Sequence, residues 1–132
     1  MHRGDDNDAS KKLKLAETAA AELSPLISQA PTLRQGSFSN SIEEYAEAVI
    51  LQTYLLEGRI ATRKEVQLAE VDEYLGGVLD FTGELNRIAI AKATIRDKVA
   101  VQKARDVVET LQGQFLRFDL RNGALRKKYD AL

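Results

Sequence analysis

Apolar residues recur at helical spacing along most of the chain. The stretch from Glu73 to Arg87 (EYLGGVLDFTGELNR) shows this most clearly when it is drawn as a helix turning about 100° per residue. One stripe of that helix is apolar and is predicted to face a core; it comprises Tyr74, Val78, Phe81, Leu85, Ile88 and Ala89. Alternation of apolar and polar residues, which is typical of strands, is absent. The chain is therefore predicted to be all-α.

A second strong helix is predicted from Ser41 to Glu57. Its first stripe holds Ile42, Tyr45, Val49, Gln52 and Leu56, and a second, with Ala48, Leu51 and Leu55, widens the apolar face. The pattern predicts helices or turns elsewhere too. Before it, the pattern predicts a capped helix over 9–23 after the acidic cluster 5–8, a kink or new start at Ser24-Pro25, and a loop over 29–40. After it, a short helix is predicted over 62–69 with a Thr62–Glu65 capping box, followed by the central helix, which ends near Arg96-Asp97. The rest of the chain is predicted to form a helix over 98–118, a turn at Asn122-Gly123 and a last helix over 124–132.

Three glycines, Gly76, Gly77 and Gly83, interrupt the central helix. Each costs about 1 kcal/mol relative to alanine inside a helix. Helix propensity does not explain their presence, so we expect close approach by another helix or by a ligand.

Composition sets limits on the chemistry. With 132 residues, the chain is predicted to form one domain over 1–132. Its net charge of −1 gives no global signal for nucleic acid. It has no cysteine, and its single histidine is His2, so thiolate or histidine zinc sites and histidine-dependent catalysis are excluded. No apolar run approaches a membrane span and the start has no secretory pattern, so a cytoplasmic location is expected.

Two basic clusters are interpreted as solvated faces in preference to phosphate sites. The first is Lys11, Lys12 and Lys14, and the second is Arg121, Arg126, Lys127 and Lys128.

Two pairs of acids stand at helical spacing on two different predicted helices. Glu44 and Glu47 share the stripe of Ala48, and Asp80 and Glu84 project beside the core stripe of the central helix. Half-buried carboxylates need partners or a cation. If the two helices pack antiparallel, the four acids converge and favour Mg²⁺ or Mn²⁺, which could activate water for phosphodiester hydrolysis.

Each pair also has a structural interpretation. Ser41 and Glu44 match a capping box, in which Glu44 would only bond the Ser41 amide. Asp80 and Glu84 could belong to a solvated face together with Glu73, and Glu84 could pair with Arg87 three residues later. Helical geometry alone favours this solvated face for the second pair.

A family resemblance favours the metal site. The segments EEYAEAVILQTYL (43–55), EYLGGVLDFTGELNR (73–87) and FLRFDLRNGALRKKYDAL (115–132) resemble the translin family, and within it the branch of translin-associated factor X. The resemblance extends from His2 onward through almost the whole chain. It implies an antiparallel helical bundle that assembles into hollow homo-oligomeric, octameric shells and binds single-stranded RNA and possibly DNA.

In that branch, the resemblance implies a Mg²⁺-dependent endoribonuclease in which Mn²⁺ can substitute. The motif acids fall here on Glu44, Glu47, Asp80 and Glu84, which would bind the metal. Candidate RNA contacts are Arg34, Arg87 and Lys92. Family members usually have one further helix at each end. A non-catalytic single-stranded RNA- or DNA-binding scaffold is the alternative function.

Overall fold

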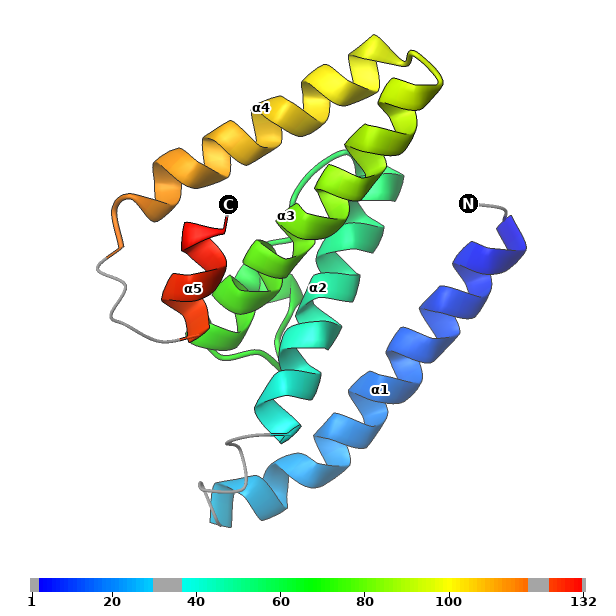
Figure 1. Cartoon of the computed structure of the whole chain (residues 1–132). Coiled ribbons are helices and arrows are strands. Elements are labelled where there is room, and N and C mark those ends of the chain that lie inside the picture. The colour runs from blue at the N-terminus through cyan, green and yellow to red at the C-terminus, as the bar shows by residue number, and fades with distance from the viewer. Residues whose placement is uncertain (1–2, 30–36, 119–123, 132) are drawn as a thin grey trace. The chain divides into compact units, whose positions relative to one another are not determined.

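The computed structural model describes residues 3–29, 37–118 and 124–131, and every regular element in these ranges is helical. The elements are α1 (Arg3–Gln29), α2 (Ser37–Glu57), the 3-10 turn η2 (Arg63–Glu65), α3 (Val71–Thr94), α4 (Lys98–Phe115) and α5 (Ala124–Asp130) (Figure 1). The all-α prediction is confirmed. The chain divides into two compact units, residues 1–77 and 78–132, and the division falls inside α3.

In the first unit, α1 and α2 lie side by side and run in opposite directions (Figure 1). The Gln52 side-chain amide, near the end of α2, donates to the Ser10 hydroxyl near the start of α1 at 2.8 Å. Farther along the pair, burial raises the pKa of Tyr45 on α2, and the charge of Glu17 on α1 adds to the rise.

Helix α1 is longer than the sequence predicted. It begins at Arg3 instead of Ala9, so residues 5–8, which were predicted to precede the helix, are part of it. It also continues through Pro25 to Gln29. Proline removes one backbone donor and leaves the carbonyl four residues earlier without it. Because Pro25 and Ala21 are both exposed, water can satisfy that carbonyl.

Helix α2 also starts earlier than predicted, at Ser37, so the predicted loop over 29–40 is wrong in its last four residues. Residues 30–36 lie outside the described ranges. Ser41 is inside the helix, and its hydroxyl donates to the Ser37 carbonyl at 2.8 Å. The Ser41–Glu44 capping box is therefore wrong, because Ser41 is not at a helix start.

The buried face of α2 differs from the predicted one. Its buried residues repeat every four positions: Ile42, Ala46, Ile50 and Tyr54. The prediction was right at Ile42 and wrong at Leu56, which is 60% exposed. The widening stripe is half-buried at Ala48 and Leu51 and exposed at Leu55. The small Ala46 is fully buried because α3 approaches the backbone there, as described below.

Between α2 and α3, the chain makes a short folded segment. Gly58, with φ of 72°, ends α2, and its amide donates to the Tyr54 carbonyl at 2.8 Å. The predicted helix over 62–69 is only the three-residue turn η2. The Glu65 carboxylate accepts from the Thr62 amide at 3.1 Å, so this half of the predicted capping box is present. Hydrogen bonding from Arg59 is the largest cause lowering the pKa of Glu65.

In the second unit, α3 and α4 form a hairpin closed by a tight turn. Arg96 adopts a left-handed conformation with φ of 61°, and the Asp97 side chain accepts from the Ala100 amide at 3.1 Å to cap α4. The predicted core stripe of α3 is confirmed, with Val78, Phe81 and Leu85 buried. Helix α4 buries Ala104, Leu111 and Phe115 and ends three residues before the predicted Phe118.

Helix α5 belongs to the second unit. The Tyr129 ring stacks on the Phe115 ring at the end of α4, with 5.9 Å between the ring centroids. The predicted turn at Asn122-Gly123 lies outside the described residues. None of the helices within the described ranges is long and apolar enough to cross a membrane.

Candidate functional site

The N-terminal part of α3 packs against α2 with almost no space between the backbones. A Cβ added at Gly77 would lie 2.7 Å from the Ala46 Cβ and 3.0 Å from the Glu47 backbone nitrogen. One added at Gly76 would overlap the Glu43 carboxylate. The close approach by another helix is confirmed at both positions. At Gly77 it requires glycine, because the neighbouring atoms are the Ala46 Cβ and backbone, whereas at Gly76 the neighbour is the end of the flexible Glu43 side chain. At Gly83 no other helix approaches, because an added Cβ would meet nothing within 4 Å.

The predicted acids of α2, Glu44 and Glu47, lie at or next to the contact between α2 and Gly77. Glu47, whose backbone faces Gly77, has a half-buried side chain, and Glu44, one turn earlier, is exposed. Because the capping box is absent, Glu44 is not used to cap the helix.

A third acid of the same unit, Glu73, is buried and hydrogen-bonded. Glu73, in the first turn of α3, is only 4% exposed. Its carboxylate accepts from the Ser39 hydroxyl at 2.8 Å and from the Glu70 amide at 2.9 Å. The predicted solvated face is therefore wrong at Glu73, which joins the start of α2 to the start of α3 and is protected from solvent.

Next to Glu73, Tyr74 fixes the segment that precedes α3. Its phenol donates to the Ala61 carbonyl at 2.7 Å. Burial is the main cause that raises the pKa of Tyr74, and the charge of Glu65 contributes. The start of α3 is thus held by polar contacts on two sides.

The predicted acids of α3 are paired with cations in the second unit. Asp80 Oδ2 lies 2.7 Å from Lys128 Nζ on α5, and the two side chains are 32% and 29% exposed. Glu84 Oε1 lies 3.1 Å from Arg87 Nη1, as the structural interpretation predicted. Both carboxylates are thus accessible to solvent, and each already has a positively charged partner.

Sequence reasoning missed Lys128. The basic cluster near the end of the chain was interpreted as solvated, and this holds for the exposed Arg126 and Lys127 but is wrong for Lys128. Arg126 pairs with Asp130 at 3.0 Å on the surface of α5, and Arg121 lies outside the described residues. Helical spacing could have indicated that Lys128 faces the protein, because it lies on the same side of the helix as Leu125 and Tyr129. All three residues are half-buried in the structure.

The four predicted acids have the ligand type of a hard divalent cation, but the structure does not show them grouped around one ion. Glu44, Glu47, Asp80 and Glu84 offer only carboxylate oxygens, which suit Mg²⁺ or Mn²⁺. Within 3–29, 37–118 and 124–131, no three His, Cys, Asp or Glu side chains are grouped so as to hold one metal ion. Convergence of the four acids stays a prediction.

The candidate RNA contacts differ in accessibility. The Arg87 side chain is 78% exposed while it pairs with Glu84, so it can reach a phosphate. Lys92 is half-buried, and Arg34 lies outside the described ranges. The predicted solvated face of α1 is confirmed, since Lys11, Lys12 and Lys14 are all exposed.

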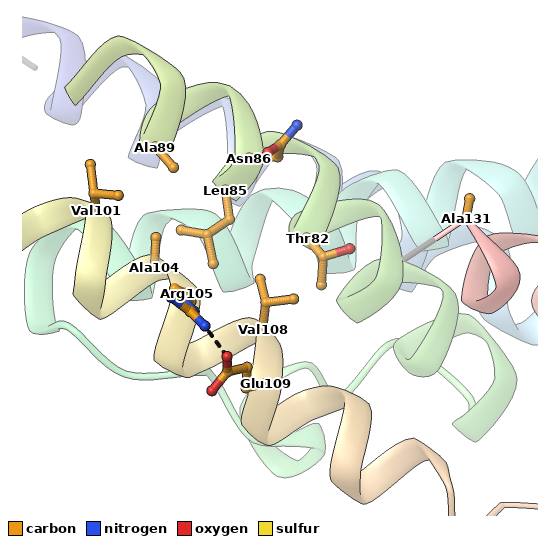
Figure 2. A pocket seen from close by; sticks show the side chains of 10 residues that line it. All are labelled: Thr82, Leu85, Asn86, Ala89, Val101, Ala104, Arg105, Val108, Glu109 and Ala131. Carbon is orange, nitrogen blue, oxygen red and sulfur yellow. Dashed lines mark hydrogen bonds and ion pairs between the residues drawn. The ribbon is translucent and has the colours of Figure 1, made fainter. Parts of the chain in front are cut away.

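A groove of about 400 Å³ opens between α3 and α4 in the second unit (Figure 2). Leu85 on α3 and Val108 on α4 point toward each other across it, and Ala104 lies beside them. Arg105 pairs with Glu109 at its rim, with 3.0 Å between Nε and Oε1. Polar and apolar side chains line the groove in similar measure.

Comparison with known proteins agrees with the helical architecture. The family model described as "Translin family" matches residues 2–132. The chain belongs to the translin family. Proteins named translin from Gallus gallus and Homo sapiens are each 33% identical over 63 residues. That match covers 48% of this chain and only 28% of each relative, so the chain matches less than a third of their length.

Proposed function

We propose that this translin-family protein is a Mg²⁺-dependent endoribonuclease acting on single-stranded RNA, of the type found in the translin-associated factor X branch. In this proposal, Glu44 and Glu47 of α2 and Asp80 and Glu84 of α3 bind one divalent site. The protein would act as a homo-oligomer in the cytoplasm.

The glycine crossing is the observation that carries the proposal. Gly77 brings α3 against the backbone of Glu47. Asp80 follows Gly77 on the same continuous helix by three residues, which is slightly less than one turn. The acid pairs on α2 and α3 support the proposal by their residue type and helical spacing, and their convergence on one ion is part of the proposal.

The four carboxylates would orient the ion and the attacking water. A bound Mg²⁺ supplies Lewis-acid activation of the phosphate and lowers the pKa of a coordinated water. The exposed Glu44 is suited to accept a proton from water, because no cap hydrogen bond occupies it. Arg87, exposed on α3 beyond the acids, would contact the RNA phosphates.

Cleavage of an end-labelled single-stranded RNA tests the proposal. Activity should require Mg²⁺ or Mn²⁺, disappear with EDTA, and fall by about 100-fold or more in Glu47→Gln and Asp80→Asn. Glu109→Gln, which removes an exposed acid of α4, is the matched control and should retain activity. Equal cleavage by all these variants would rule the nuclease out.

A non-catalytic scaffold that binds single-stranded RNA or DNA is the second candidate. The ion pairs Asp80–Lys128 and Glu84–Arg87 favour it, because both acids of α3 have structural partners, and the relatives share the name translin. This candidate predicts salt-sensitive RNA binding that survives substitution of all four acids, with no turnover under any metal condition.

A further inference from the structure

Positive charge is concentrated at one end of the second unit. Between Glu84 and Asp106, the sequence contains six of the chain's 19 Lys and Arg residues but only one of its 20 Asp and Glu residues, Asp97. This basic segment consists of the end of α3, the turn and the start of α4 (Figure 1). The net charge of −1 is therefore the sum of a strongly basic segment and an acidic remainder.

The turn at the centre of the basic segment is closed by backbone hydrogen bonds. The Asp97 amide donates to the Lys92 carbonyl at 2.9 Å, and the Lys98 amide donates to the Arg96 carbonyl at 3.0 Å. α3 therefore ends and α4 begins within a few residues. Arg96 and Lys98 lie two positions apart in this turn, and both are exposed.

The cations of the basic segment differ in their partners. At its flanks, Arg87 and Arg105 each pair with a glutamate on their own helix. The Asp97 carboxylate accepts from the Ala100 amide at 3.1 Å and caps α4. Among the residues that the structure describes, no acid pairs with either of the two cations of the turn. An external anion therefore meets no competing carboxylate there.

Arg96 also has an unusual backbone conformation. Its φ of 61° lies in the left-handed region, which glycine adopts more readily than residues with a side chain. The residue that ends α2 in this region is Gly58, with φ of 72°. Helix termination alone therefore favours glycine at position 96. The arginine has a conformational cost, which is typical of residues at functional sites.

Two exposed aliphatic side chains flank the cations of the turn. Ile95 is 68% exposed and Val99 is 81% exposed. A single RNA strand offers unstacked bases for apolar contacts as well as phosphates for cations. An anionic membrane would offer a similar pair of contacts, but one myristoyl chain gives only marginal membrane binding, and the two side chains together have fewer carbons than such a chain. The turn therefore suits single-stranded RNA better than a membrane.

We propose that the turn between α3 and α4 binds the phosphates of single-stranded RNA through Arg96 and Lys98. The proposal rests on the RNA binding that both candidate functions share, and it requires no metal ion. It adds two contacts to Arg87 and Lys92, which belong to the same basic segment. The aliphatic neighbours make the surface better suited to a single strand than to a duplex.

Fluorescence anisotropy of a labelled single-stranded oligouridine, measured in EDTA to prevent cleavage, tests the proposal. The double variant Arg96→Gln/Lys98→Gln should bind about 25-fold more weakly than wild type at about 0.1 M salt. Each phosphate contact releases about 0.7 counterion from a single strand, which is worth about fivefold at this concentration. The slope of log affinity against log salt should also become less steep by about 1.4.

Two exposed lysines of α1 provide the matched control. Lys11→Gln/Lys14→Gln removes the same charge from the chain and should bind RNA like the wild type. Equal losses in the two double variants, or no loss in either, would overturn the proposal, because the turn would then have no special role. If the wild type itself binds no RNA, both candidate functions fail as well, which is a different result.

Arg96→Gly separates the charge from folding. Glycine favours a φ of 61°, so this variant should melt at the same temperature as the wild type or higher, and it should still lose about fivefold in RNA affinity. Arg96→Lys keeps the charge and should bind within about twofold of the wild type. Unchanged RNA affinity in Arg96→Gly would contradict the contact.

Flotation with phosphatidylglycerol vesicles tests the membrane alternative. Under the proposal, Arg96→Gln/Lys98→Gln reduces RNA binding, and wild-type chain and variant float with the vesicles to the same small extent. A variant that loses vesicle binding and retains RNA binding would assign the turn to a membrane and overturn the RNA contact.

Discussion

Glycine and glutamate occur in both parts of α3 but have different surroundings in each part. In the first unit, up to Gly77, that glycine lets the helix touch the backbone of α2, and Glu73 is buried. In the second unit, from Val78 onward, Gly83 faces open space, Glu84 forms a surface ion pair, and a groove of about 400 Å³ separates side chains of α3 and α4. The comparison teaches that the role of a helical Gly or Glu depends on what lies opposite it.

The largest expected difference is between the two glutamates. Glu73→Ala should destabilise the fold by about 2–4 kcal/mol, because the Ser39 hydroxyl and the Glu70 amide lose a charged acceptor. Glu84→Ala should cost no more than about 1 kcal/mol, since its partner Arg87 is mostly exposed. Urea unfolding of both variants measures this, and equal losses would break the distinction between the two parts of α3.

The glycines give a second, smaller difference. Alanine gains about 1 kcal/mol of helix propensity at either position, so this gain cancels when Gly77→Ala is compared with Gly83→Ala. What remains is the overlap of the new Cβ with Ala46 and Glu47, which should make Gly77→Ala less stable by about 1–3 kcal/mol. Thermal unfolding of the pair checks this. Matching melting temperatures would mean that the α2–α3 contact is looser than the structure shows.

The groove of the second unit should tolerate added volume. Ala89 lines it and is half-buried, so Ala89→Leu can place new methyl groups against Val101 and Ala104. We expect unchanged or increased stability, by up to about 1 kcal/mol, from the apolar area that is buried. A loss of stability in denaturant unfolding would show that the groove is as tightly packed as the α2–α3 crossing.

Several features of the fold were predictable because they depend on local periodicity. The helical class, the end of α2 at Glu57, the central helix and its buried Val78, Phe81 and Leu85 all follow from apolar spacing. Helix starts were less predictable. α1 and α2 both begin earlier than predicted, at Arg3 and Ser37. Their first residues lack a clear apolar period but can still be helical, because tertiary packing of the rest of a helix stabilises its ends.

The candidate site was predictable in its residue types and only partly in its surroundings. The four acids and the glycines at 76 and 77 were identified from spacing and propensity, and the glycine contact is confirmed. The partners of the acids were not. Ser39 reaches Glu73 across 34 positions of sequence and Lys128 reaches Asp80 across 48, and such distant pairs leave no periodic signal.

By itself, the sequence determined that this chain is helical and that carboxylates are its only plausible metal ligands, because composition and periodicity are local properties. Its resemblance to the translin family rested on three sequence segments, 43–55, 73–87 and 115–132. Tertiary structure decided which glycines touch a neighbouring helix, which glutamate is buried, and which lysine neutralises Asp80. These depend on which side chains meet across the fold, and burial and charge pairing arise only when distant segments come together.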